Sequence, residues 1–341
     1  MQSRSRTITV AGAGIVGLWQ ALVLARRGHR VRLLERSAEP FALAASALAG
    51  AMLAPYCEAE AAEPVVRDLG FVSMALWRAT YPGVTPNGTL VVAGARDRAE
   101  LLRFARMTEG YERVDRDALQ SLEPALAGRF AEGLHYRAEG HMVPAHAMRF
   151  LLEAVRAAGA EVAFSTPWER ASGEDRLVID CRGLAARPDL ADLRGVRGER
   201  LVIKTQEIEL ARPVRLLHPR QPLYLVPWGE GRFLVGATVI ESDDPGPVTV
   251  RSALELLGSA YALHPAFAEA QIIEMTAGVR PAFPDNVPKI VVRGPTIYVN
   301  GLYRHGFLLA PVLADLVAKH LETGAVHDGI FRIERPVSPP A

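Results

Sequence analysis

Cysteine and lysine are both scarce in this chain of 341 residues. The two cysteines, Cys57 and Cys181, lie far apart and form neither a C-x-x-C pair nor a metal-ligand spacing. We therefore expect no structural disulfide, no bound metal and a reduced, cytoplasmic setting. Only three of the 39 basic residues are lysine, the net charge is +1, and no positive run is long enough to follow a phosphate backbone. This composition argues against nucleic acid as a partner.

Long apolar runs are also few. Residues 7–25 are almost uncharged and follow two arginines, a pattern that a signal peptide or membrane anchor shares. Three glycines at fixed spacing, with no cleavage site after them, favour a buried strand and helix inside a sheet instead. The second run, residues 307–321, is interrupted by a proline, an aspartate and a lysine, which indicates a packed helix. We therefore expect no membrane span.

The clearest motif lies at the start of the chain. A short apolar run is followed by G-x-G-x-x-G at Gly12, Gly14 and Gly17, then by a helical pattern and a second strand that ends at Glu35. Gly12 permits the tight turn, Gly14 lets backbone N–H groups approach a pyrophosphate, and Gly17 allows close packing of helix on strand. Glu35, 18 residues after Gly17, is placed to accept the hydroxyls of an adenosine ribose. The unit predicts a dinucleotide site and, taken alone, fits NAD and FAD about equally.

Two kinds of pattern alternate along the rest of the chain. A buried-type strand leads to Cys181 and Gly183, as expected where a parallel sheet meets a nucleotide again. Strand-rich segments separated by proline and glycine fill residues 198–240 and indicate an antiparallel sheet. The sequence therefore predicts an α/β fold in which a discontinuous Rossmann-like nucleotide-binding domain carries an inserted antiparallel-sheet α+β substrate domain. The predicted nucleotide-binding domain comprises residues 1–80, 141–197 and 276–335, the substrate domain 81–140 and 198–275, and the flexible tail 336–341.

Apolar residues at helical spacing predict the helices outside the first motif. No internal repeat is present. The predicted helices cover residues 97–108, 117–122, 145–158, 251–263 and 308–321.

Several motifs, in this order, resemble the D-amino-acid-oxidase superfamily of flavoproteins, and above all its glycine oxidase branch associated with thiamine biosynthesis. The resemblance covers nearly the whole chain, which makes it far more specific than the first motif alone. The motifs read AGAGIVG with LLER, ASALAGAMLAP, GHMVPAHAM, VIDCRG with GVRGERL, LYLVP, FLVGAT, TAGVRPAFPD and LYRHGFLLAP.

The resemblance implies FAD as the cofactor of the nucleotide-binding domain. It implies that the adenosine lies on Glu35 and Arg36, that the pyrophosphate lies over the glycine turn, and that small residues from Ser46 to Met52 pass along the flavin ring. The turn before the last helix would present N–H groups to the flavin C2 carbonyl, where a helix N-terminus favours negative charge. The implied cofactor-binding residues are Gly12, Gly14, Ile15, Val16, Gly17, Glu35, Arg36, Ser46, Gly50, Ala51, Met52, Val162, Cys181, Gly183, Arg280, Arg304, His305, Gly306, Phe307 and Leu308.

The resemblance also implies a substrate site with three catalytic residues. Arg280 matches the arginine that pairs with an amino-acid carboxylate, and a guanidinium suits this task because its contact is bidentate and fixed. Tyr224 matches a tyrosine that donates its hydroxyl to the same carboxylate, and Arg304 matches a second basic residue close to the flavin. From the residues alone, Arg280 could equally be a surface arginine and Tyr224 a sheet aromatic.

The chain departs from the family pattern near the last helix. Family members commonly carry a histidine two residues before the position of Arg304, where this chain has Leu302. His305 follows the arginine instead, either as a polar contact to substrate or flavin or as a histidine without a chemical role. These departures leave the preferred substrate open.

The resemblance thus implies FAD-dependent oxidation of a small amino acid or secondary amine, such as glycine, sarcosine, a D-amino acid or an iminodiacetate-like compound. Hydride would pass from Cα to flavin N5, the imine would hydrolyse in water, and O2 would reoxidise the flavin to give hydrogen peroxide. A dehydrogenase with another electron acceptor stays open, as does a homo-oligomer. Less favoured alternatives are an NAD(P)H-dependent flavin hydroxylase, whose acidic motif is missing here, and a non-catalytic flavoprotein subunit. A disulfide reductase would need a C-x4-C pair that this chain lacks.

Overall fold

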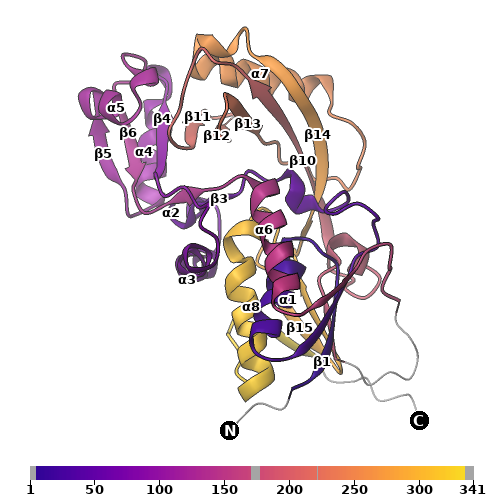
Figure 1. The fold of residues 1–341 in the computed structure, drawn as a ribbon. Coiled ribbons are helices and arrows are strands. Elements are labelled where there is room, and N and C mark those ends of the chain that lie inside the picture. The colour runs from indigo at the N-terminus through magenta and orange to yellow at the C-terminus, as the bar shows by residue number, and fades with distance from the viewer. Residues whose placement is uncertain (1–4, 170–176, 221, 335–341) are drawn as a thin grey trace.

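The computed structural model describes residues 5–169, 177–220 and 222–334. Two large sheets lie one above the other, with α7 over the upper sheet and a layer of α1, α6 and α8 in the lower half (Figure 1). Both sheets are predicted features, and the model has the mixed α/β character that the sequence indicates. The predicted tail 336–341 lies outside the described residues.

The lower sheet has seven strands in the order β17-β15-β16-β9-β1-β2-β8. All of its pairings are parallel except β15 with β16. The strand β1, next to the middle of the sheet, is fully buried at its apolar residues Ile8, Val10 and Ala11, as expected for a strand covered on both faces. The strands are β1 (Thr7–Ala11), β2 (Arg30–Leu34), β8 (Glu161–Ala163), β9 (Leu177–Asp180), β15 (Lys289–Arg293), β16 (Thr296–Asn300) and β17 (Phe331–Glu334).

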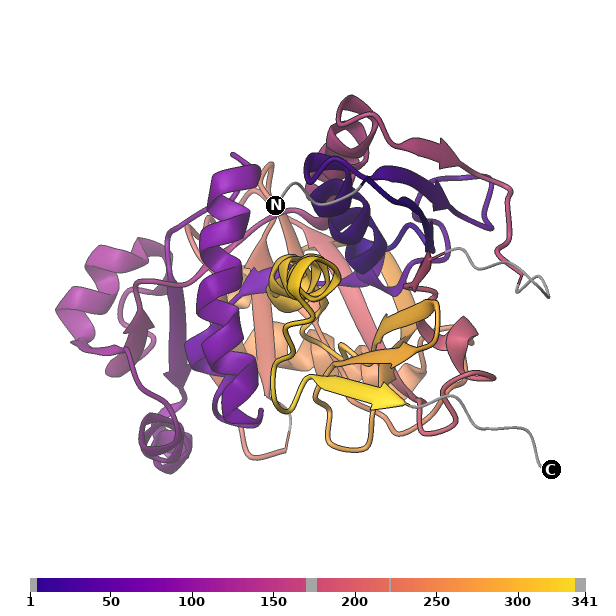
Figure 2. The ribbon, with the colours of Figure 1, turned by 90° about the horizontal axis from the view of Figure 1, so that it is seen from below.

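Helices α1, α3, α6 and α8 share one hydrophobic core with this sheet. Helix α8 packs against both α1 and α3, and Figure 2 shows it end-on between them. It is two residues longer at each end than the predicted helix 308–321. Gly324, in the left-handed conformation that favours glycine, ends it. These helices are α1 (Ile15–Arg26), α3 (Pro64–Thr80), α6 (Pro144–Ala157) and α8 (Gly306–Thr323).

Helix α3 has no counterpart among the predicted elements. Its buried residues Val66, Leu69, Met74 and Trp77 nevertheless follow helical spacing, so the signal was present in the sequence. A proline at its first turn, Pro64, is also a typical helix start.

The upper sheet has eight strands in the order β14-β10-β13-β12-β11-β4-β6-β5. It is antiparallel as predicted except where β11 pairs with β4 in parallel. No hairpin fixes the direction of this pair, because the chain passes through the lower sheet between the two strands. Its strands and outer helices are β4 (Thr89–Ala93), β5 (Glu112–Asp115), β6 (Glu132–Tyr136), β10 (Arg194–Lys204), β11 (Val214–Leu217), β12 (Leu223–Pro227), β13 (Arg232–Gly236), β14 (Gln271–Ala282), α4 (Arg98–Met107), α5 (Arg116–Leu122) and α7 (Val250–Leu263).

A small ribbon and a short helix connect the two sheets. Strand β3 (Met52–Leu53) pairs with β7 (Gly140–His141), and α2 (Pro55–Glu58) follows directly. Strands β10 and β14 both run past the predicted domain boundaries, so the boundaries themselves stay predictions. Within the described residues no helix combines the length and the apolarity needed to cross a membrane.

Candidate active site

The glycine turn between β1 and α1 is sterically closed at two of its three glycines. Gly12 has φ +95°, and a Cβ there would lie 2.8 Å from the carbonyl oxygen of Cys181. A Cβ at Gly17 would overlap the carbonyl oxygen of Gly12, so helix and strand could not approach as they do. A Cβ at Gly14 would make only ordinary contacts within the protein. Gly14 is therefore the position whose missing side chain leaves room for something outside the chain.

Glu35 at the end of β2 is hydrogen-bonded to the same turn. Its Oε2 accepts the N–H of Ala13 at 2.8 Å, and its Oε1 accepts the N–H of Ser37 at 3.0 Å. Oε1 also accepts the hydroxyl of Ser37 at 3.1 Å, so Oε2 is the oxygen that keeps a lone pair for another donor. The turn thereby fixes the carboxylate beside the start of α1.

The other predicted adenosine and pyrophosphate residues lie around this turn. Arg36 is exposed after β2, and Val162 in β8 pairs with Leu33. Cys181 and Gly183 follow β9, the neighbour of β1. Residues Ile15 and Val16 form the first turn of α1.

The small-residue segment 46–52 crosses from the glycine turn to the upper sheet. The Oγ of Ser46 accepts the N–H of Ile15 at 3.1 Å, which holds one end at the start of α1. At the other end, a Cβ on Gly50 would lie 3.1 Å from the ring of Tyr224. Ala51 adopts φ +52°, and Met52 opens β3. The segment therefore joins the predicted nucleotide end to the predicted substrate end.

Two glycines of the upper sheet make room for Tyr224 and Arg280. Tyr224 on β12 lies opposite Gly236, where a Cβ would be 2.6 Å from its Cζ. Arg280 on β14 lies with its guanidinium over Gly198 of β10, where a Cβ would overlap it. Burial raises the pKa of Tyr224, and the nearby charge of Arg280 opposes that shift. The sheet thus brings together two residues that are 56 positions apart in the sequence.

Within the described part of the chain, the Arg280 guanidinium makes one hydrogen bond, from Nη1 to the carbonyl oxygen of Thr238 at 3.2 Å. Among the residues that the structure describes, no carboxylate lies within ion-pair distance of it. A half-buried guanidinium without a counter-charge is suited to bind an anionic ligand.

Arg304 is paired differently, with a residue that the sequence analysis did not identify. Its Nε lies 2.7 Å from Oε2 of Glu58, and Nδ1 of His305 lies 3.3 Å from the same oxygen. Arg215 contacts the other oxygen, Oε1, at 2.7 Å. Burial alone would raise the pKa of Glu58, but the charges of Arg304 and Arg215 hold it well below its usual value. Glu58 is therefore ionised, and no local pattern in the sequence marks it.

His305 and Leu302 are both buried beside this cluster. Burial lowers the pKa of His305 to about 4, so the imidazole is neutral at pH 7. Leu302 bridges to Ala282 at the end of β14.

The first turn of α8 directs its side chains into the protein. The ring of Phe307 stacks on Trp77, and the Nε1–H of Trp77 donates to the Phe307 carbonyl at 2.6 Å. Leu308 packs against α3 at Gly70. The backbone N–H of Leu309 donates to the carbonyl oxygen of His305, so the N–H groups of Gly306, Phe307 and Leu308 are the ones that can meet a ligand at this helix N-terminus.

The comparisons with known proteins identify the family of this chain. The family model for FAD-dependent oxidoreductases, DAO, matches residues 7–320 and so spans both sheets. The chain belongs to this family. It is 52% identical over 317 residues to a Rhizobium etli protein that carries the name of the thiamine biosynthesis oxidoreductase ThiO, covering 93% of this chain and 96% of that protein.

This FAD-dependent oxidoreductase also has more distant relatives, among them a named oxidase and a solved crystal structure. The D-amino-acid oxidase of Streptomyces coelicolor is 31% identical over 293 residues, covering 82% of this chain and 84% of that protein. The crystal structure of glycine oxidase from Bacillus cereus superposes with a TM-score of 0.81 at 21% identity, covering 94% of this chain and 96% of that one. At this identity the structural match establishes the shared fold.

The residues around the glycine turn of the oxidoreductase fit FAD. The open side of Gly14, the spare lone pair on Oε2 of Glu35 and the N-terminus of α1 are what the dinucleotide's pyrophosphate and ribose require. The small-residue segment then runs toward Tyr224, in the direction in which an extended cofactor would continue.

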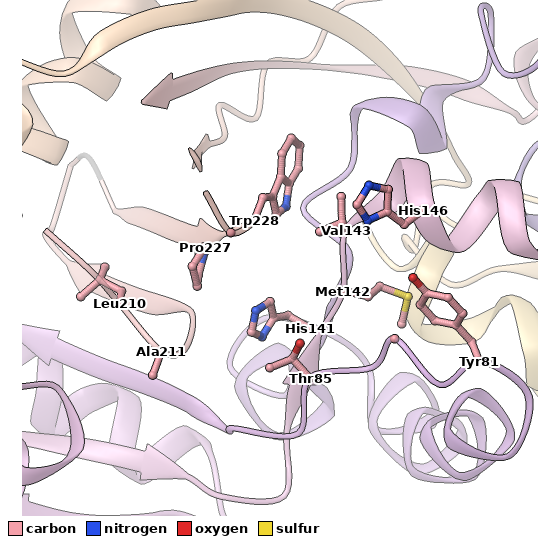
Figure 3. Close-up of a pocket in the computed structure, with 12 residues that line it drawn as sticks. Tyr81, Thr85, His141, Met142, Val143, His146, Leu210, Ala211, Pro227 and Trp228 are labelled. Carbon is pink, nitrogen blue, oxygen red and sulfur yellow. The ribbon is translucent and has the colours of Figure 1, made fainter. Parts of the chain in front are cut away.

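A pocket of about 360 Å³ lies beside the end of the small-residue segment. Figure 3 shows Trp228 facing His141 and His146 across it, with Tyr81 and Thr85 from the loop after α3. None of the predicted site residues lines this pocket. Its walls nevertheless adjoin the candidate active site, because His141 pairs with Met52 and the N–H of Met142 donates to the carbonyl oxygen of Ala51.

Proposed function

We propose that this oxidoreductase oxidises a small amino acid or secondary amine that carries a carboxylate beside the amine. Arg280 carries the proposal, because its guanidinium lies next to Tyr224 and has no carboxylate partner among the described residues. A substrate carboxylate would supply that counter-charge through a bidentate contact. The names of the relatives, a thiamine biosynthesis oxidoreductase and a D-amino-acid oxidase, support the same class of substrate.

In this mechanism the chain contributes orientation. Arg280 binds the carboxylate and the Tyr224 hydroxyl donates to it, which fixes the position of the substrate α-carbon. FAD, when bound, supplies the acceptor for the hydride that leaves this carbon. The N–H groups at the start of α8 would stabilise negative charge near them.

The substrate amine enters as the free base. His305, the neutral imidazole nearest to the cluster, is buried against Glu58, so the mechanism assigns it no proton transfer. The imine product then hydrolyses in water. We propose O2 as the final electron acceptor, with a dehydrogenase of D-amino acids that uses another acceptor as the alternative. The cytoplasmic setting and self-association are further predictions from the sequence.

Anaerobic reduction of the purified holoenzyme tests this function. Glycine, sarcosine or D-alanine should bleach the bound FAD, and admitting air should restore the absorbance with release of peroxide. Bleaching by none of a panel of amino-acid and amine substrates would refute the proposal. Bleaching by NADPH instead would favour a hydroxylase.

A further inference from the structure

We propose that Glu58 makes the site selective for amines with one carboxylate, because it occupies Arg304 and leaves Arg280 as the guanidinium that binds an anion. The inference rests on the function proposed above and narrows its substrate class. Glu58 is in this view a specificity-determining residue that acts through Arg304.

The position of Glu58 is fixed from two sides. It is the last residue of α2, and the N–H of the preceding Cys57 donates to Oε1 of Glu139 at 2.8 Å. Glu139 is fully buried, so this contact anchors the short helix. The two oxygens of Glu58 are divided between Arg215 and Arg304, each at 2.7 Å. A carboxylate held by two guanidiniums from different elements has little freedom to release either of them.

Both arginines of this cluster already have a carboxylate partner within the protein. Arg215 and Arg304 share the carboxylate of Glu58, and Glu139 also lies close enough to Arg215 to act on its charge. Burial raises the pKa of Glu139 to about 7, with the charge of Arg215 opposing the shift. Arg280 stands outside this set and has no carboxylate of its own among the described residues.

A second arginine on the same face is also paired. Arg200 is buried on β10 and donates from Nη2 to Oε1 of Glu274 at 2.9 Å. Its charge is therefore paired with Glu274, while its Nε and Nη1 have no hydrogen-bond partner among the described residues.

A dicarboxylate would have to place its second group near Arg304. That group would approach a guanidinium whose Nε edge already faces Glu58, and the two carboxylates would repel each other at short range. Selectivity by repulsion of the wrong ligand is a common device where attraction alone does not discriminate.

The test compares iminodiacetate with N-isobutylglycine. The two secondary amines have the same branching and number of heavy atoms, but only iminodiacetate carries a second carboxylate. We expect the wild-type holoenzyme to oxidise N-isobutylglycine with a kcat/KM at least ten times higher. Glu58→Gln removes the charge with little change of volume and should move this ratio at least tenfold toward iminodiacetate. Glu58→Asp keeps the charge and should keep the wild-type preference.

Glu60→Gln is the matched control, because it is the same chemical change two residues away. Glu60 pairs with Arg103 at 2.7 Å, outside the cluster. Its substrate ratio should equal that of the wild type. FAD absorbance and melting temperature report whether each variant is folded and loaded.

Inhibitor binding to the wild type tests the same selectivity without depending on the folding of Glu58→Gln. Isovalerate and malonate are isosteric mono- and dicarboxylates, and as competitive inhibitors isovalerate should bind at least ten times more tightly. Equal use of both amines by the wild type, equal inhibition by both acids, or an unchanged ratio in a folded Glu58→Gln variant would overturn the inference and leave the proposed function standing. Failure of every monocarboxylate amine to reduce the flavin would instead refute the proposed function.

Discussion

The nucleotide end and the substrate end of this oxidoreductase are built in different ways. At the nucleotide end, the decisive groups are backbone atoms and glycines within one stretch from β1 to β2. At the substrate end, the decisive groups are charged and aromatic side chains from β11, β12, β14, α2 and the start of α8. Local spacing therefore determines the first site, whereas strand pairing and charge balance over the whole chain determine the second.

Gly17→Ala should give the largest effect and test the nucleotide end. The added Cβ overlaps the carbonyl oxygen of Gly12, and neither backbone segment can yield without separating α1 from β1. We expect a loss of at least about 3 kcal/mol in the free energy of unfolding, together with loss of FAD. Urea unfolding followed by fluorescence measures the change.

Gly14→Ala is the matched control for that prediction. Its Cβ would make only ordinary contacts inside the protein, the nearest being 3.6 Å from Ser46 Oγ. The apoprotein should keep its stability while its affinity for FAD falls. Equal destabilisation by both substitutions would contradict this division between a packing glycine and a ligand-facing glycine.

At the substrate end, the ionisation of Glu139 should change the free energy of unfolding by an amount comparable to that of Gly17→Ala. Burial raises its folded-state pKa from 4.5 to about 7, so the folded protein prefers the protonated acid. Its contribution to stability is complete below about pH 4.5 and is lost as the pH rises to about 7. By linkage this loss is on the order of 3 kcal/mol.

Comparing the wild type with Glu139→Gln isolates the pH-dependent contribution of Glu139 to the free energy of unfolding. The variant cannot ionise, so the difference in unfolding free energy between the two proteins should change between pH 4.5 and 7 and be flat above. The comparison is needed because His141, whose pKa burial lowers to about 4, acts in the opposite direction over an overlapping range. A difference that stays constant with pH would show that Glu139 has the same pKa in the folded and the unfolded protein.

The same contrast explains which features could be predicted from the sequence. The glycine turn, Glu35 and the helix at the end of the chain follow from local patterns, and Arg280, Tyr224 and the FAD cofactor follow from a family resemblance. Glu58 and Arg215 could not be found this way, since each is an ordinary charged residue until β11 and α2 bring them together.

Arg280→Ala should have a smaller effect, which is limited to the binding and turnover of substrate. Losing a charged hydrogen-bond partner should weaken carboxylate substrates by at least about 2 kcal/mol, or about 30-fold in kcat/KM. Arg280→Lys keeps the charge but not the bidentate geometry and should recover only part of this. Steady-state kinetics with sarcosine measures both variants, and an unchanged KM for Arg280→Ala would remove the residue from the site.

Trp77→Phe should give the smallest loss of stability, and it tests the contact between α3 and the start of α8. The indole N–H of Trp77 donates to the Phe307 carbonyl at 2.6 Å and so ties α3 to the first turn of α8, beside Arg304 and His305. Removing it should cost about 1 kcal/mol in unfolding free energy beyond the lost ring volume.

Trp19→Phe corrects for that volume. Trp19 packs edge-on against Trp77 in the same core, but its buried N–H has no partner among the described residues. The two substitutions remove the same atoms, so chemical denaturation of both variants separates the hydrogen bond from the packing. If Trp19→Phe destabilises the protein as much as Trp77→Phe does, the bond does not hold α8 in place. The start of that helix would then be positioned by the packing of Phe307 and Leu308 and by the ion pairs of Glu58.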